Sequence, residues 1–376
     1  MRTALLNAAV LCVSLVVSLA VGEVLVRAFT PFPPSKNQRV ADPDLGYRLS
    51  RSLPEVDTHG FRNPAGRRDR YTLAAIGDSH TYGNNVHRRN TWPEQFDKEL
   101  DGHVYNFGIG SYGIATYHRL IMQEIKDKKK VILALYPGND FIADKSFCQI
   151  NFQKSDFWRR QPESEVLAEF ADACDSPSSD DGGVIDLIKN TAIHEAIDYL
   201  YERVAVTWAI SDREQYFVAG VPQPILRERL RRRAAYTDTE RADVVKLLET
   251  YRSFAARWRG RAMPDQLGIL VIPSKGRVFA EVVRRETNRE GAANEFMDLA
   301  QRQNALHRRV RRIAAENDIP VVSALPELAA RVAADGEPGI YRPRDGHPAG
   351  PAGYAAYVDA AQRLWKRMRQ RANDDG

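Results

Sequence analysis

The sequence predicts an α/β protein built on a parallel, doubly wound sheet. Short apolar runs alternate with longer segments in which apolar residues recur at helical spacing, and this alternation is typical of parallel sheets. Several of the runs end in glycine or small polar residues, which places those residues at the carboxyl edge of the sheet, where α/β proteins carry their chemistry. At 376 residues, the chain can hold two domains or one elaborated domain.

Residues 4–22 carry no charge and are mostly Leu, Val and Ala, with Arg2 before them and Glu23 after. A helix of this length reaches ~28 Å, close to the thickness of a bilayer core. We therefore interpret residues 1–30 as an uncleaved, single-pass membrane anchor that holds an extracytoplasmic domain. The alternative is a secretory signal cut after Ala20 or Gly22, since the residues there are small.

A Pro-rich linker and a polar lead-in occupy residues 31–70 and are expected to wrap the surface of the domain. The domain itself spans 71–376. Its predicted strands are 71–76, 104–107, 131–136, 267–272 and 319–322, and its predicted helices are 81–100 (broken near Trp92–Pro93), 117–128, 239–258, 294–316 and 351–371.

The pattern is interrupted at about 145–237, which we interpret as a largely helical insertion beside the site, in the manner of a cap. Cys148 and Cys174 lie within it. In an exported protein these two thiols could close a loop of about 26 residues, or they could be unrelated.

The net charge of +5 comes from 54 Lys and Arg against 49 Asp and Glu. Most of the basic clusters alternate with apolar residues at helical spacing, which indicates solvated helix faces. We therefore expect no nucleic-acid partner.

The strongest chemical signal is Gly77-Asp78-Ser79 directly after the first strand. A serine hydroxyl becomes a good nucleophile when an imidazole removes its proton, and the imidazole works best when a carboxylate fixes its tautomer. The sequence offers His347 as the base and Asp345 as the orienting carboxylate. Both follow the fifth strand, so they should meet Ser79 at the same edge of the sheet.

An acyl-transfer site also needs donors for the oxyanion. The candidates are the amide of Ser79, an amide of the glycine-rich loop at Gly110 or Ser111, and the side chain of Asn139. We expect Asp78 to cap the helix that begins at the serine.

Other residues near these strand ends have simpler interpretations. Asp140, with Asp144 nearby, is expected to order its loop and not to bind a metal, so no metal and no cofactor are predicted. Lys275 either meets an anionic substrate or simply starts a helix. His80 adjoins the nucleophile but is expected to point away from the substrate.

Four segments together resemble the conserved blocks of the SGNH, or GDSL, hydrolase superfamily: Gly77-Asp78-Ser79, Asn106-Phe107-Gly108, Gly138-Asn139-Asp140 and Asp345-Gly346-His347. The resemblance implies a flavodoxin-like three-layer fold. It also implies a serine nucleophile, a histidine base, and an oxyanion hole shared by Ser79, the glycine loop and Asn139.

Two departures stand out from the family pattern. Only Gly346 separates Asp345 from His347, where the family usually has two residues. This spacing is similar to membrane-associated polysaccharide O-acetyltransferases and also to some plain hydrolases. In the second block, Ser111 stands where a glycine is expected.

The function that the sequence predicts is that of an SGNH-type hydrolase of a carbohydrate or lipid ester at the cell envelope, acting through an acyl-serine intermediate. A first alternative is an O-acyltransferase that works with envelope polysaccharide machinery. A second is a non-catalytic glycan-binding module that keeps the fold.

Overall fold

The computed structural model describes residues 2–29, 39–100, 103–125, 129–138, 140, 154–155, 217–218, 221–222, 242–261, 266–286, 293–341 and 346–374. At its centre is a five-stranded parallel sheet with the order β4-β3-β5-β8-β9. Numbered along the chain, these strands lie in the order 2-1-3-4-5, which is the doubly wound arrangement of flavodoxin-like folds. The predicted parallel sheet is therefore confirmed.

The five strands are β3 (Leu73–Ile76), β4 (Val104–Asn106), β5 (Lys130–Leu135), β8 (Leu267–Val271) and β9 (Val321–Ser323). Each begins and ends within two residues of the predicted run. Every residue of β3, β4 and β8 is buried. Near-continuous apolar runs suit such strands, because helices cover both faces of a parallel sheet.

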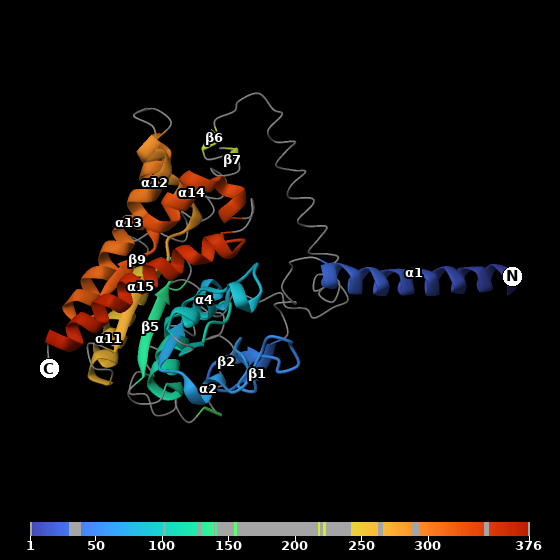
Figure 1. The fold of residues 1–376 in the computed structure, drawn as a ribbon, viewed down its shortest axis with the longest axis horizontal. Helices are drawn as coiled ribbons and strands as arrows, with labels where there is room; N and C mark the ends of the chain where they lie inside the picture. Colours follow the sequence, from blue (N-terminus) through green and yellow to red (C-terminus); the bar gives the residue numbers. More distant parts are fainter. Residues whose placement is uncertain are drawn as a thin grey trace.

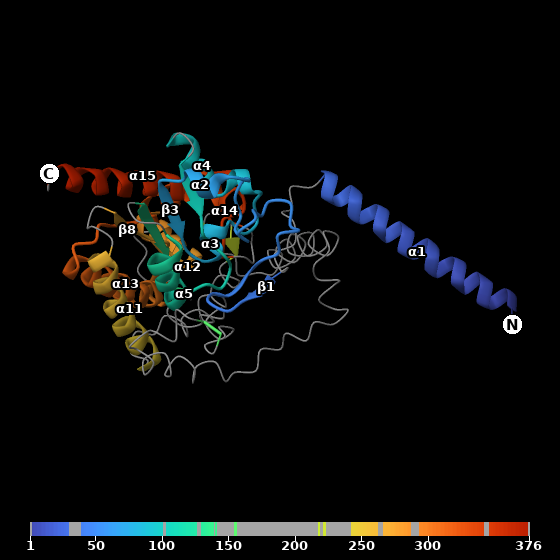
Figure 2. The ribbon, with the colours of Figure 1, turned by 90° about the horizontal axis from the view of Figure 1, so that it is seen from below.

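Helices form one layer on each side of the sheet (Figure 2). One face is covered by α5 (Ile114–Arg119), the π-helical turn η2 (Leu120–Glu124), α11 (Ala242–Arg261) and α13 (Ala293–Glu316). The other face is covered by α4 (Trp92–Glu99), α12 (Lys275–Glu286), α14 (Leu325–Ile340) and α15 (Pro351–Asp374). The three-layer arrangement follows, since each sheet face must bury its apolar side chains against another element.

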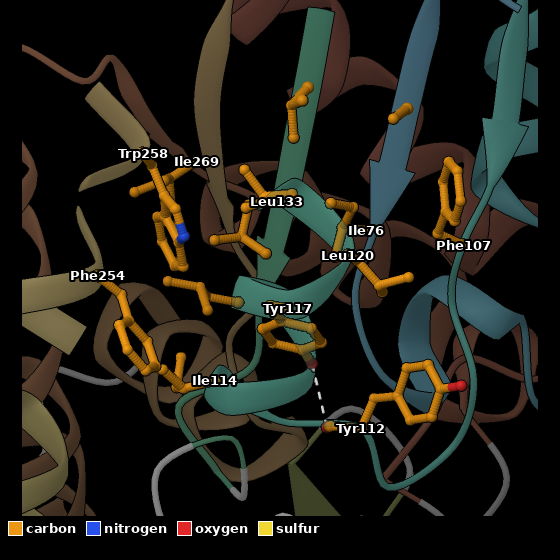
Figure 3. Close-up of a cluster of buried hydrophobic side chains, with 14 of the residues drawn as sticks. Ile76, Phe107, Tyr112, Ile114, Tyr117, Leu120, Leu133, Phe254, Trp258 and Ile269 are labelled. Carbon is orange, nitrogen blue, oxygen red and sulfur yellow. Dashed lines mark hydrogen bonds between the residues drawn. The ribbon is translucent and has the colours of Figure 1, made fainter. Parts of the chain in front are cut away.

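Figure 3 shows the first of these interfaces, where aromatic and aliphatic side chains fill the space between the sheet and its helices. Leu133 and Ile269 of the sheet face Trp258 and Phe254 of α11, and Tyr117 of α5 lies between them and the β4 loop. His118 belongs to the same layer: its ring stacks on Phe254 at 4.1 Å and accepts a hydrogen bond from the Trp258 indole.

The helices near the first two strands differ from the prediction. Instead of one helix over 81–100, a short α3 (Ser79–Tyr82) precedes α4. Thr91 caps α4, and Pro93 occupies its first turn, where the missing amide costs nothing. The pair Trp92–Pro93 therefore starts a helix and does not break one.

Two long helices lie outside the predicted helical segments, although α12 begins at Lys275, which the sequence offered as a possible helix start. α12 follows β8 directly, and the 16-residue α14 separates β9 from the loop of His347. α14 runs through Gly336, Pro338 and Gly339, residues that usually mark turns. As a result, His347 does not directly follow the fifth strand, as the sequence suggested, but lies between α14 and α15.

The lead-in is more than a surface wrap. It contains the antiparallel hairpin β1 (Arg39–Asp42) and β2 (Gly46–Leu49) and the short helix α2 (Arg67–Arg70). Three of its apolar side chains are almost fully buried in the core on the sheet face that α5, α11 and α13 cover: Leu45, Tyr47 and Phe61. The prediction of a purely superficial segment was wrong, because these apolar residues are too scattered to show a periodic pattern.

The N-terminal helix α1 (Arg2–Phe29) projects away from the α/β core (Figure 1). Large apolar side chains on it are exposed, among them Leu11 and Val16. No helix in the described part of the chain is long and apolar enough to cross a membrane. The span predicted over residues 4–22 is thus not supported.

Most of the predicted insertion lies outside the described residues, as do Cys148 and Cys174. Within it, the structure describes the small hairpin β6 (Phe217–Val218) and β7 (Val221–Pro222). It also describes Ser155, whose hydroxyl donates to Asp44 of the lead-in at 2.6 Å.

Candidate active site

Ser79 lies at the carboxyl edge of the sheet, where β3 turns sharply into α3. Asp78 caps the helix, since its Oδ1 accepts a hydrogen bond from the amide of His80 at 2.9 Å. The turn requires glycine at position 77, because a Cβ there would lie 2.2 Å from the Thr81 hydroxyl oxygen. Ser79 is the first residue of α3, so its amide is one of those that lack a partner inside the helix.

His347 meets the nucleophile although 268 positions separate them. Its Nε2 lies 2.7 Å from the Ser79 Oγ, within hydrogen-bond distance. The loop that carries it is closed by the bridge between Tyr341 and Pro348 and by the bond from the Ala349 amide to the Ile340 carbonyl. The predicted contact between nucleophile and base is therefore present. Asp345, the proposed orienting carboxylate, lies outside the described residues.

Two further polar groups reach this pair. The carboxylate of Asp78 is fully buried and its Oδ2 accepts from the Ser79 hydroxyl at 3.2 Å. The side-chain amide of Asn84 lies 3.5 Å from His347 Nε2. The Ser79 hydroxyl can therefore donate its proton to Asp78 or to His347. Transfer to His347 yields an alkoxide next to an imidazolium.

The loop after β4 lies against the nucleophile. A Cβ on Gly108 would come within 2.4 Å of the Tyr82 amide nitrogen, so glycine allows this loop to approach α3. The side chain of Asn106 fixes the approach by donating to the Thr81 carbonyl at 3.0 Å and accepting from the Gly108 amide at 2.8 Å.

Of the two predicted oxyanion residues of this loop, Gly110 lies beside Ser79 and Ser111 follows it in the chain. A Cβ built on Gly110 would be 3.7 Å from the Ser79 Cβ. Ser111 has φ of 66°, in the left-handed region that favours glycine. This backbone conformation explains why a glycine is expected at position 111. Ser111 adopts the left-handed conformation that a glycine would have there.

The lead-in hairpin holds the same loop from outside. Tyr47 donates its hydroxyl to the Gly110 carbonyl at 2.7 Å, and Arg39 donates to the same oxygen at 3.3 Å. The peptide between Gly110 and Ser111 is trans, so its N–H points opposite to that carbonyl. Tyr47 therefore sets the direction of the Ser111 amide. It is a positioning residue that the sequence did not reveal.

Asp140 orders the turn after β5, as predicted. Its carboxylate accepts from the Tyr136 amide at 2.7 Å and from the Tyr117 hydroxyl at 3.1 Å. Asn139, the third oxyanion candidate, precedes it and lies outside the described residues, as does Asp144.

Two buried residues that the sequence did not associate with His347 lie near its ring or near the start of its loop: His80 and Lys275. His80 is buried, and its ring centroid is 4.4 Å from that of His347. Lys275 is also buried, with its ammonium 5.5 Å from the ring centroid of Tyr341, at the start of the base loop. His80, which the sequence predicts to point away from the substrate, thus lies with its ring against that of His347.

No protein-family model matches this chain, and no curated protein is a significant match to its sequence. Two solved structures are similar. A lipolytic protein of the G-D-S-L family from Desulfitobacterium hafniense DCB-2 is 14% identical, with a TM-score of 0.33 over 78% of this chain and 98% of its own. Phospholipase A1 from Streptomyces albidoflavus NA297 is 10% identical, with a TM-score of 0.38 and the same coverage. Likenesses this distant do not establish a function, which must be inferred from the site.

Proposed function

We propose that the protein is a serine ester hydrolase of the SGNH, or GDSL, type. The observation that carries the proposal is the 2.7 Å contact between the Ser79 hydroxyl and His347 Nε2 at the carboxyl edge of the sheet. A buried structural serine needs no imidazole partner from a loop 268 positions away. The glycine-rich loop beside Ser79 supplies backbone amides where an oxyanion would form.

In the proposed reaction, the Ser79 Oγ attacks the ester carbonyl while His347 Nε2 takes its proton. The tetrahedral oxyanion accepts hydrogen bonds from the Ser79 amide and from the amide of Gly110 or Ser111. His347 then gives its proton to the departing alcohol, and the acyl group stays on Ser79. Water, activated by the same imidazole, completes the hydrolysis.

The substrate that we propose is a carbohydrate or lipid ester. An O-acyltransferase is the second candidate, because the single residue between Asp345 and His347 resembles the spacing in polysaccharide O-acetyltransferases as well as in some plain hydrolases. The two reactions share the acyl-serine and differ in whether water or a sugar hydroxyl receives the acyl group.

Chromogenic acyl esters of increasing chain length test the proposal. We expect turnover by the wild-type protein and a loss of about a thousandfold or more in kcat for Ser79→Ala and for His347→Ala. His59→Ala, in an exposed turn of the lead-in, is the matched control and should keep full activity. Full turnover in both site variants would refute the proposal.

An acetyl donor supplied with and without an oligosaccharide separates the two reactions. Free acetate that forms at the same rate in both samples supports hydrolysis, whereas an acetylated sugar supports transfer. If the protein neither turns over any ester nor reacts with a fluorophosphonate, the non-catalytic glycan-binding module becomes the better account.

The compartment is also part of the proposal. The uncharged segment 4–22 supports export of the domain from the cytoplasm. Cell fractionation followed by N-terminal sequencing of the mature protein tests this, and a full-length chain recovered from the cytoplasm would contradict it.

A further inference from the structure

His80, the residue after the nucleophile, lies behind the catalytic imidazole. Its side chain is 1% exposed. Its ring centroid is 4.4 Å from that of His347, with 37° between the ring planes, and 4.3 Å from that of Tyr136. One imidazole is therefore packed between a tyrosine at the end of β5 and the imidazole that contacts Ser79.

The position of His80 is fixed from two sides. Its amide donates to the Asp78 carboxylate at 2.9 Å, which fixes the backbone at the start of α3. Its Nδ1 is hydrogen-bonded to the Tyr357 hydroxyl at 3.0 Å. Burial, followed by the charges of Tyr341, Tyr354 and Asp78, raises the pKa of Tyr357 well above its ordinary value, so the phenol stays neutral.

The side chain of His80 therefore connects the segment that carries Ser79 with the segment that carries His347. His80 stands next to Ser79 in the sequence, whereas Tyr357 stands on α15, the helix that follows the His347 loop. A histidine ring rotates about a broad torsional minimum unless something packs on it. A ring packed against His347 limits that rotation and keeps Nε2 directed at the serine.

We propose that His80 is a positioning residue: its ring, anchored by Tyr357, packs against His347 and holds the catalytic imidazole on the Ser79 hydroxyl. This role rests on the proposed hydrolase function. His80 itself does not touch the ester or the reacting oxygen.

Three variants separate positioning from simple packing. His80→Ala removes the ring, and we expect kcat to fall about 10- to 100-fold with little change in KM. Tyr357→Phe removes the anchoring hydroxyl and keeps the ring, so a smaller fall in kcat is expected. His80→Phe keeps a ring and should restore most of the kcat lost in His80→Ala.

His118→Phe is the matched control, because His118 is also a buried histidine that stacks on an aromatic ring, but in the layer of α11. It should change thermal stability and leave kcat unchanged. Active-site titration with a fluorophosphonate corrects every kcat for the folded fraction.

NMR relaxation of the His347 ring in the wild type and in His80→Ala gives the second readout, which needs no turnover: the ring should be more mobile in the variant. An unchanged kcat in His80→Ala after correction, or equal mobility of the His347 ring in the two proteins, would overturn the proposal. If the wild type hydrolyses no ester, the proposed function fails, and the relaxation data still decide whether His80 holds the His347 ring.

Discussion

The two regions that meet at the site are held in different ways. The turn of Ser79 is fixed by buried polar groups: Arg62 donates to the carbonyls of Tyr82, Gly83 and Val86, and Asn106 donates to that of Thr81. The loop of His347 is fixed by a backbone bridge and by close packing against α15. The nucleophile region should therefore be sensitive to the loss of one polar group, and the base region to a change of volume.

The largest effect on stability is expected at Arg62. This guanidinium is 1% exposed, donates to three carbonyls and pairs with Glu55, so Arg62→Ala leaves several buried acceptors and a carboxylate without a partner. We expect a loss of about 3–5 kcal/mol in the free energy of unfolding. Arg312→Ala, at a side chain that is 66% exposed, is the control and should change it by less than about 0.5 kcal/mol. If chemical denaturation gave the same change in the free energy of unfolding for both variants, the region of Ser79 would not depend on this buried polar group.

Gly353→Ala tests the packing of the base region. A Cβ at this position in α15 would lie 2.7 Å from the Pro348 Cβ and 2.8 Å from the Ile340 carbonyl oxygen, so the loop of His347 must shift. We expect a destabilisation of about 1–3 kcal/mol together with a lower kcat. If the region had room, alanine would instead stabilise the helix by up to about 1 kcal/mol. Whether Gly353→Ala lowers or raises the temperature of thermal unfolding therefore shows whether the region of His347 is closely packed.

Tyr47→Phe tests whether the hairpin supports the glycine loop. The variant loses the 2.7 Å bond to the Gly110 carbonyl, so it should lose about 1 kcal/mol of stability, and kcat should fall a few-fold as the loop amides lose their direction. Tyr105→Phe loses a comparable buried bond, to Asp57, away from the site. Its stability should fall in the same way with an unchanged kcat. A matching fall in kcat in both variants would contradict this role.

The smallest effect concerns the pH dependence of the nucleophile region. Burial by itself would raise the pKa of Glu55, but the charge and hydrogen bonds of Arg62 and the Arg88 amide outweigh it and lower the pKa below its ordinary 4.5. The stability from this pair is therefore complete above pH 4.5 and is lost as the pH falls through the lower folded value. Glu55→Gln should flatten this part of a stability–pH curve, and an unchanged slope would contradict the assignment.

The sequence reveals those parts of the structure whose signal is local. The runs at β3, β5 and β8 are apolar along their length, and the glycine before Asp78-Ser79 is required by the turn itself. Helix α14 was missed because turn-forming residues occur in its last turns, and packing against α12 and α15 overrides them.

Contacts between distant segments had no such signal. Tyr357 reaches His80 across 277 positions, and Tyr47 reaches Gly110 from a hairpin whose first strand is largely exposed. Nothing in the residues around either tyrosine indicates its partner. These supporting residues follow from the fold and not from any motif.

The most direct measurement of the central claim is the mass of the intact protein after reaction with a fluorophosphonate, followed by peptide mapping. The account predicts one adduct, on Ser79, that forms rapidly in the wild type and far more slowly in His347→Ala. An adduct on another residue, or equal labelling rates in the two proteins, would contradict the assignment of Ser79 as a nucleophile activated by His347.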